Sequence, residues 1–461
     1  MSIKNYEPKE KATSGIIDAS SRPIEMIYDP ETNKTSFVCL KGKKILTLNR
    51  FCKDPRSDLW LVPYSPDNDL IQNGMVLFPS CAENYKSEKE LVKTIQEFIH
   101  HYLAVSPFFE KIASYYVLFT WIYDNFNELP YLRAIGDFGS GKSRFLKTVG
   151  SICYKPIFAN GATTISPIFR LIDEFRGTLI IDEADLSRSD FSCEMIKILN
   201  SGHEKGSPVI RSESLNGKEY SPKSFNVYGP KILSTREFFT DKALESRFIV
   251  EEMPSGVKLR HDLPINLPND FAKQALKIRN KLLMFRLKNY GKRTINEKLV
   301  DHTLEARLNQ ITVPLMSIID DAELQQELKE SVQRYYNQMV NDRGMEFDGQ
   351  ILEAIKELID QGDTEPLIGR IKEKLIQKYG SDCENVTARG IGARIRKAFR
   401  LHTKKTREGY IIPKSEKATL ERFYERYGLV NNVNDVNVSQ PKAKDESEGV
   451  DIDDIINQLP S

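Results

Sequence analysis

The chain of 461 residues lacks the marks of several large protein classes. Its six cysteines are widely scattered and no two form a C-x-x-C pair, which argues against a zinc ribbon and against a disulfide framework. The six histidines form no H-x-x-x-H pair. We find no signal peptide and no apolar run long enough to span a bilayer, so we expect a cytoplasmic protein without membrane contact.

The chain also has almost no net charge. Its 66 Lys and Arg against 65 Asp and Glu give a formal charge of +1, so the molecule as a whole is not a polyelectrolyte binder. Any nucleic-acid surface must therefore be a local basic patch. The apolar fraction of 40% is ordinary for a globular chain and is enough for more than one core.

Changes in residue pattern divide the chain into five parts. Residues 1–85 indicate a small β-containing domain, and residues 86–260 begin with helices and continue with strands that alternate with helices. Residues 261–345 have a helical pattern. Residues 346–430 predict helices followed by a basic β-hairpin, which is typical of a winged helix that binds DNA. Residues 431–461 are polar and acidic, and we expect a disordered tail.

Five short apolar segments in the second part predict a parallel sheet flanked by helices, because strands there alternate with helical patterns. The fold class expected is therefore α/β. The predicted strands are "YLRAIG", "PIFAN", "TLIID", "KILST" and "FIVEEM".

The stretch GDFGSGKSRFLK, residues 136–147, has three glycines within six residues and then an apolar-patterned helix. It matches G-x-x-x-x-G-K-[ST] in the required strand-to-helix context. Backbone N–H groups that surround a phosphate need room, which explains the bare backbone. We expect Lys142 to pair with the β- and γ-phosphates of ATP and the Ser143 hydroxyl to ligate Mg²⁺. The residues expected to contact the nucleotide are Gly136, Asp137, Phe138, Gly139, Ser140, Gly141, Lys142, Ser143 and Arg144.

Two later strands end in polar residues. In "GTLIIDEADL", Asp182 is expected to hold Mg²⁺ through water, and Glu183 to orient and deprotonate the attacking water. Water as the acceptor favours ATP hydrolysis over a small-molecule kinase, although a solvated acidic turn has the same local pattern. In "GPKILSTRE", Ser234 or Thr235 is a candidate sensor of the γ-phosphate, with a strand-end cap as the alternative.

An arginine in "DKALESRFIVEEM" lies between a short helix and a strand. Arg247 there suits charge stabilisation in phosphoryl transfer, supplied to the adjacent subunit. A surface arginine is the alternative.

Together, "GDFGSGKSRFLK", "GTLIIDEADL" and "ALESRF" resemble AAA+ ATPases, and within them the MCM-like helicases, including the self-loading helicases of bacterial mobile elements and phages. The resemblance covers roughly residues 130–320 and the winged helix. It implies a homohexameric ring with ATP at subunit interfaces, and a helical lid in which Arg307 reaches the γ-phosphate. Two departures are Ile249, where MCM proteins usually have Asp, and the missing zinc-bearing N-terminal domain.

Two regions are candidates for DNA contact. Asn216-Gly217 predicts a two-residue hairpin turn, with Lys218 at its tip and Lys223 further along. In a ring of this family such a hairpin faces the channel, where lysine would grip single-stranded DNA. From 387 to 410 there are eight Lys or Arg and one acidic residue. A solvated charged face is the alternative there. The candidate DNA contacts of this second region are Arg394, Arg396, Lys397, Lys404, Lys405 and Arg407.

These observations favour an ATP-dependent DNA helicase, a ring motor that replicates a mobile element, phage or plasmid. One alternative is another DNA-associated AAA+ ATPase, such as a clamp-loader-like, transposition or partition switch. A second is a DNA-binding initiator or regulator with an inactive ATPase core. The acidic tail could in addition dock a partner protein.

Overall fold

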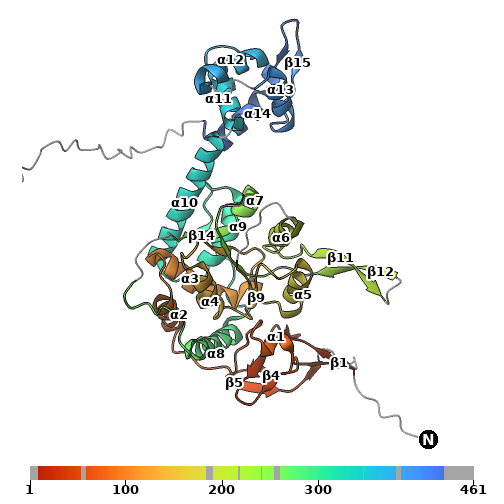
Figure 1. The fold of residues 1–461 in the computed structure, drawn as a ribbon, viewed down its shortest axis with the longest axis vertical. Coiled ribbons are helices and arrows are strands. Elements are labelled where there is room, and N and C mark those ends of the chain that lie inside the picture. The colour runs from red at the N-terminus through yellow and green to blue at the C-terminus, as the bar shows by residue number, and fades with distance from the viewer. Residues whose placement is uncertain are drawn as a thin grey trace, which may run out of the picture. The chain divides into compact units, whose positions relative to one another are not determined.

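The computed structural model divides the chain into two units, Met1–Gln333 and Arg334–Ser461 (Figure 1). We describe each unit by itself. The residues that the structure describes are 9–52, 59–182, 190–215, 219–239, 241–253, 260–345, 347–380 and 386–429.

A five-stranded sheet forms the centre of the first unit. All its neighbouring strands run parallel, in the order β14-β8-β13-β10-β9, which confirms the predicted parallel α/β sheet. Every residue of β8, β10 and β13 is buried, as expected for strands covered on both faces. The strands are β8 (Tyr131–Ile135), β9 (Ile157–Ala159), β10 (Leu179–Ile181), β13 (Lys231–Thr235) and β14 (Phe248–Glu252).

Helices lie on both sides of this sheet (Figure 1). The helix α2 begins after Ser87, whose side chain accepts a hydrogen bond from the backbone N–H of Glu90 at 3.2 Å. The helix α3 is apolar nearly all round, and ten of its residues are buried. The flanking helices are α2 (Glu88–Tyr102), α3 (Pro107–Thr120), α4 (Lys142–Gly150), α5 (Ile165–Phe175), α6 (Asp190–Ser201), α7 (Lys242–Glu245) and α8 (Phe271–Asn289).

The N-terminal strands belong to the same unit as the central sheet. Glu25 of β3 is buried, with Lys155 Nζ at 2.8 Å and Arg286 Nε at 2.6 Å from its carboxylate oxygens. Since Lys155 follows α4 and Arg286 belongs to α8, this ion cluster ties three segments together. The elements before α2 are β1 (Lys9–Ala12), β2 (Gly15–Ile17), β3 (Pro23–Asp29), β4 (Lys34–Lys41), β5 (Lys44–Leu48), β6 (Phe51–Cys52), β7 (Leu59–Val62) and α1 (Asp69–Gln72).

A two-stranded hairpin projects from the core (Figure 1). It consists of β11 (Val209–Leu215) and β12 (Glu219–Phe225), which pair antiparallel. The last pair of the ladder is Leu215 with Glu219, and the predicted turn at Asn216-Gly217 falls on the residues between them. These connecting residues, Lys218 among them, lie outside the described residues.

Helices follow the sheet, as the pattern of residues 261–345 predicts. They are α9 (Ala306–Met316) and α10 (Ala322–Met345), and the boundary between the two units falls within α10. No helix in the described ranges has the length and apolar character that a bilayer crossing needs.

The second unit packs a small core of its own. Ile391, Ile395 and Phe399, the apolar residues of the basic segment, are each at most 1% exposed and belong to this core. The candidate tail, residues 431–461, lies outside the described residues. The elements are α11 (Phe347–Asp360), α12 (Ile368–Tyr379), α13 (Ala388–Lys397), β15 (Lys404–Lys405), β16 (Tyr410–Ile411) and α14 (Lys417–Arg426).

Candidate nucleotide-binding site

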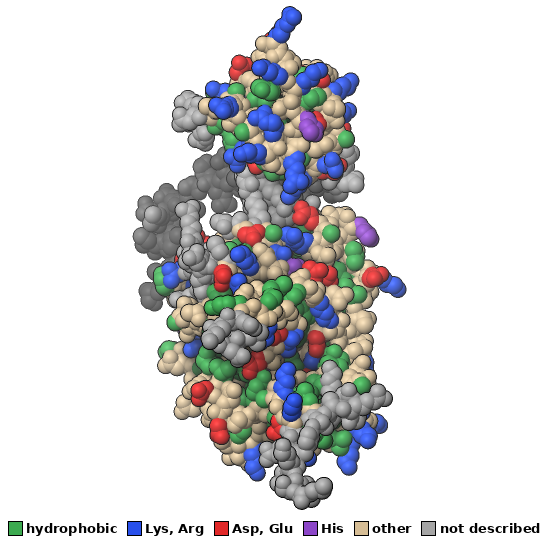
Figure 2. Space-filling view, turned by 90° about the vertical axis from the view of Figure 1, so that its right-hand side faces the viewer, with side chains coloured by type: hydrophobic (Ala, Val, Ile, Leu, Met, Phe, Trp, Pro, Cys, Tyr) green, Lys and Arg blue, Asp and Glu red, His purple; other side chains and the backbone are tan. Residues whose placement is uncertain are grey.

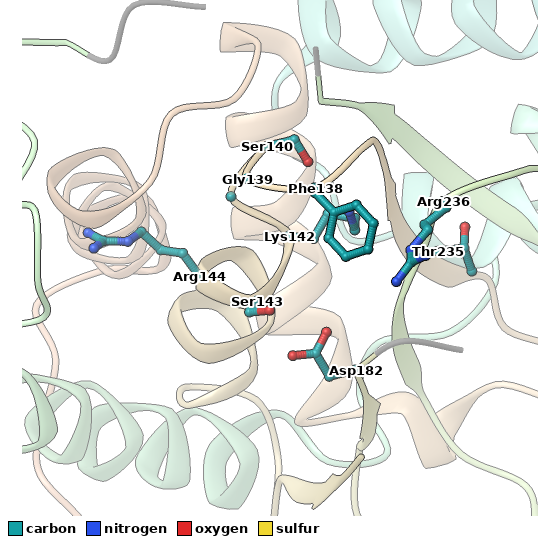
Figure 3. A pocket seen from close by; sticks show the side chains of 10 residues that line it. Phe138, Gly139, Ser140, Lys142, Ser143, Arg144, Asp182, Thr235 and Arg236 are labelled. Carbon is teal, nitrogen blue, oxygen red and sulfur yellow. The ribbon is translucent and has the colours of Figure 1, made fainter. Parts of the chain in front are cut away.

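A cavity of about 290 Å³ lies where the strands β8, β10 and β13 end (Figure 3). The carboxyl ends of parallel strands are the usual place for a ligand in an α/β sheet. The glycine-rich loop after β8 forms one wall, and the ends of β10 and β13 form another. The lining residues are Phe138, Gly139, Ser140, Gly141, Lys142, Ser143, Arg144, Asp182, Thr235 and Arg236.

The loop glycines are explained by close packing and by backbone conformation. A Cβ atom at Gly136 would lie 2.3 Å from the carbonyl oxygen of Met253, so no larger residue fits there. Gly139 and Gly141 have φ values of +75° and +96°, in the left-handed region that favours glycine. The loop can therefore turn sharply and present its backbone to the cavity.

Lys142 begins α4, and its side chain folds back over the loop. The ammonium donates hydrogen bonds to the carbonyl oxygens of Gly136 and, at 2.7 Å, Asp137. These contacts hold the ammonium inside the loop, where a bound phosphate would meet it.

Asp182 follows β10 and lines the cavity with Ser143 (Figure 3). The hydroxyl of Ser234, on the adjacent strand β13, donates to the carboxylate of Asp182 at 2.8 Å. A hydroxyl and a carboxylate beside a phosphate-binding loop are oxygen ligands of the kind that Mg²⁺ takes. No group of three His, Cys, Asp or Glu side chains that could hold a metal ion exists among the described residues. Phosphate oxygens and water are the other ligands that Mg²⁺ usually takes beside such a loop. Glu183 lies outside the described residues.

Thr235 carries a buried hydroxyl group that lacks a partner. The residue is 2% exposed, lines the cavity, and its Oγ1 makes no hydrogen bond within the described part of the chain. A buried unpaired hydroxyl is unfavourable by about 1–3 kcal/mol, which a ligand oxygen in the cavity would relieve. The residues present therefore fit a phosphate and a magnesium ion.

The sequence did not single out Arg236, which also lines the cavity. Its guanidinium carbon lies 3.9 Å from the ring centroid of Phe138, a side chain that is 73% exposed. Arg236 directly follows the candidate sensor Thr235, and this adjacency was the only available signal. The pair places a cation at the mouth of the cavity.

Arg144 lines the cavity, but its guanidinium points away from Asp182 (Figure 3). It donates hydrogen bonds to the carbonyl oxygens of Pro264, at 2.6 Å, and of Ile265. Its expected contact with the nucleotide stays a prediction.

Arg247 stands before β14, at the end of the sheet opposite the cavity. A five-residue strand spans about 16 Å, so Arg247 cannot reach the cavity of its own chain. It is 6% exposed, and its guanidinium donates to Asn200 Oδ1 at 2.5 Å and to the carbonyl of Ala243. Burial lowers the pKa of Arg247, and the nearby positive charge of Arg307 lowers it further.

Arg307 lies in the first turn of α9 and is exposed. Like Arg247, it does not line the cavity. Both arginines influence the buried imidazole of His203. Burial lowers the pKa of His203 to about 4, and the positive charges of Arg247 and Arg307 contribute to this lowering. Their part in catalysis stays a prediction.

Several candidate DNA contacts have partners within the chain. Lys223 Nζ lies 3.2 Å from a carboxylate oxygen of Glu213, and Arg394 pairs with Asp348. Arg396 donates to Thr403 at 3.3 Å. The other basic candidates of the second unit are exposed, namely Lys397, Lys404, Lys405 and Arg407. Lys and Arg side chains gather on this unit in Figure 2.

Comparisons with known proteins give only distant likenesses. No family model matches the chain, and no curated protein matches it. The C-terminal region of NrS-1 in its A form is 13% identical, with a TM-score of 0.37, covering 84% of this chain and 96% of that one. The active helicase Cch of SCCmec type IV is 12% identical, with a TM-score of 0.39, covering 90% and 81%. JCV helicase is 14% identical, with a TM-score of 0.23, covering 54% and 66%.

Proposed function

We propose that this protein is an ATP-dependent DNA helicase, a hexameric AAA+ ring motor for replication of a mobile element, phage or plasmid. The observation that carries the proposal is the meeting of Lys142, Ser143, Asp182 and the unpaired hydroxyl of Thr235 around one cavity. These groups come from a loop and two separate strands, and together they offer a cation, metal ligands and a hydrogen-bond donor to a triphosphate.

Each residue has a defined task in ATP hydrolysis. The loop amides and Lys142 bind the β- and γ-phosphates, and Thr235 donates to the γ-phosphate. Ser143 and Asp182 hold Mg²⁺, which neutralises charge on the phosphate oxygens. Glu183 orients the attacking water and accepts its proton.

A ring is supported by the position of Arg247. Because it lies at the far end of the sheet from its own cavity, it could complete only a neighbour's site, and Arg307 lies on the same side. A repeated head-to-tail contact of this kind closes into a ring when the rotation between neighbouring subunits returns to the first one. In this structure Arg247 is bonded to Asn200, so assembly would have to redirect its side chain.

DNA contact is assigned to two surfaces. The projecting hairpin, with Lys218 in its connection, faces a threaded strand. The second unit acts as a winged helix, with the exposed lysines of β15 on its wing and α13 as the basic helix. The helices α9 and α10 form the lid.

The proposal is tested by ATP turnover with and without single-stranded DNA, together with unwinding of a forked duplex. We expect DNA-stimulated turnover and unwinding, both lost in Glu183→Gln, which still binds ATP. Turnover without unwinding would indicate a switch ATPase in place of a motor. DNA binding with no turnover would indicate a regulator.

A further inference from the structure

The two faces of the projecting hairpin differ in chemistry. Side chains alternate between the faces along each strand, and the pairs Arg211↔Lys223 and Ser212↔Pro222 are neighbours in the ladder. The first pair therefore marks one face and the second pair marks the other. We call them the charged face and the uncharged face.

The charged face is occupied by contacts within the chain. Lys223 and Arg170 lie 3.2 Å and 2.9 Å from Glu213, and Arg211 lies 3.3 Å from Glu194 of α6. At the base, the buried ring of Phe225 packs against Phe169 with centroids 4.7 Å apart. Because Lys223 is already paired with Glu213, its ammonium is less available to bind a phosphate of DNA.

The described side chains of the uncharged face make no ion pair or ring contact, and they are solvent-exposed. Tyr220 is 77% exposed and Ile210 is 64% exposed, so this face presents two large apolar side chains to solvent. Figure 2 views the molecule from the side to which the hairpin points and shows hydrophobic side chains in the middle of that surface. The described exposed residues of the uncharged face are Ile210, Ser212, Tyr220, Pro222 and Ser224.

We infer that the uncharged face binds single-stranded nucleic acid, with a base stacked on the ring of Tyr220 and a sugar further along the same strand against Ile210. This inference rests on the proposed helicase function. Stacking needs an exposed aromatic ring, and every base can supply the second ring, so the contact tolerates any sequence.

A protein partner fits this face less well. A stable protein interface uses about 20–30 residues on each side, whereas this ribbon face offers five described side chains. The absence of acidic side chains among these five also suits the approach of a polyanion.

The test measures binding of a fluorescently labelled thymidine oligonucleotide to the full chain with a non-hydrolysable ATP analogue. Tyr220→Ala should weaken binding by about 5- to 150-fold, and Tyr220→Leu nearly as much, because neither keeps a ring. Tyr220→Phe should bind like the parent protein. Since no phosphate contact is removed, the dependence of log affinity on log salt should be unchanged in all three variants.

An abasic oligonucleotide of the same length supplies the matched control. Without bases, the parent protein and Tyr220→Ala should bind alike, and this coupling between ring and base is the direct mark of stacking. A cooperative thermal transition in each variant shows that the hairpin change has not unfolded the chain.

The remaining outcomes separate this inference from the proposed function. If the parent protein fails to bind the thymidine oligonucleotide, the helicase proposal itself is overturned. If the parent binds and Tyr220→Ala binds equally well, or weakens equally on the abasic strand, only the stacking inference is overturned. A change of oligomer mass in Tyr220→Ala with unchanged DNA affinity would assign the face to a protein contact and also overturn it.

Discussion

Ser234 and Asp182 are joined across neighbouring strands: the hydroxyl on β13 donates to the carboxylate after β10 at 2.8 Å. Ser234 is completely buried, so the bond is shielded from water. It holds the proposed metal-binding carboxylate at the edge of the cavity. Ser234 therefore supports the proposed metal ligand, while its neighbour Thr235 lines the cavity.

Removing the Ser234 hydroxyl should weaken the binding of magnesium at the proposed site. In Ser234→Ala we expect half-maximal ATP hydrolysis to need about 10- to 100-fold more Mg²⁺, because partners of metal ligands typically contribute that much to affinity. The measurement is a magnesium titration of turnover. Ser114→Ala removes another buried hydroxyl, one bonded at 2.8 Å to the carbonyl of Glu110 in α3, and should leave the titration unchanged. If Ser234→Ala left the midpoint of the magnesium titration unchanged, Ser234 would not support the metal ligand.

Thr235→Val should reduce turnover with little effect on ATP affinity. The change keeps the shape of the side chain and removes only the hydroxyl, whose hydrogen bond to a charged oxygen is worth about 1.5–3 kcal/mol. We expect kcat to fall about 10- to 150-fold while KM stays nearly constant, if the bond strengthens in the transition state. Steady-state kinetics check both values, and an equal rise in KM would show uniform binding instead.

Loss of the loop cation should abolish hydrolysis. Lys142→Ala is expected to lower kcat at least about 100-fold, as removal of a single charge-stabilising donor does elsewhere. Lys147→Ala changes an exposed lysine on the same helix and provides the matched control. If the two variants had comparable activity, the loop that contains Lys142 would not be the site of ATP hydrolysis.

Two inactive variants should regain ATP turnover when mixed, if each active site forms between two subunits. Lys142→Ala lacks the loop cation and Arg247→Ala lacks the far-end arginine, so each alone should be inactive. In an equal random mixture about a quarter of head-to-tail interfaces combine one intact element from each variant. Recovery of turnover on mixing is expected, measured against each variant alone. A mixture that stays inactive while rings form would remove Arg247 from the neighbour's site.

The buried Glu25 should carry a large part of the stability of the first unit. Burial would raise its pKa, but Lys155 and Arg286 hold the pKa below its usual value. Glu25→Gln takes the carboxylate away from the buried Lys155 and leaves the buried Arg286 paired with Asp124 alone. We expect a loss of about 3–5 kcal/mol near pH 7. Urea denaturation measures it, with the exposed Glu31→Gln as control.

The pH dependence of this loss has a definite sign. A carboxyl with a lowered folded pKa contributes its full stability above the unfolded pKa of about 4.3 and loses it as the pH falls through the folded value. The difference between the parent protein and Glu25→Gln should therefore shrink below about pH 4. A difference that is constant across this range would show that the charge of Glu25 is not the cause.

Local pattern was sufficient for much of the fold and for locating the glycine-rich loop that lines the cavity. The five strands, the glycine loop and the helix after Ser87 depend on alternation, spacing and backbone freedom within short windows. The interior residues Ile391, Ile395 and Phe399 followed from the same reasoning.

The sequence by itself determined where the glycine-rich loop and the acidic strand end occur, since each depends only on consecutive residues. Only the tertiary structure decided which side chains meet. It brought Arg236 to the cavity, turned the guanidinium of Arg144 away, paired Lys223 with Glu213 and put Arg247 at the far end of the sheet. The physical reason is that these contacts join segments distant in the chain, and their partners are chosen by sheet order and packing, which no short window contains.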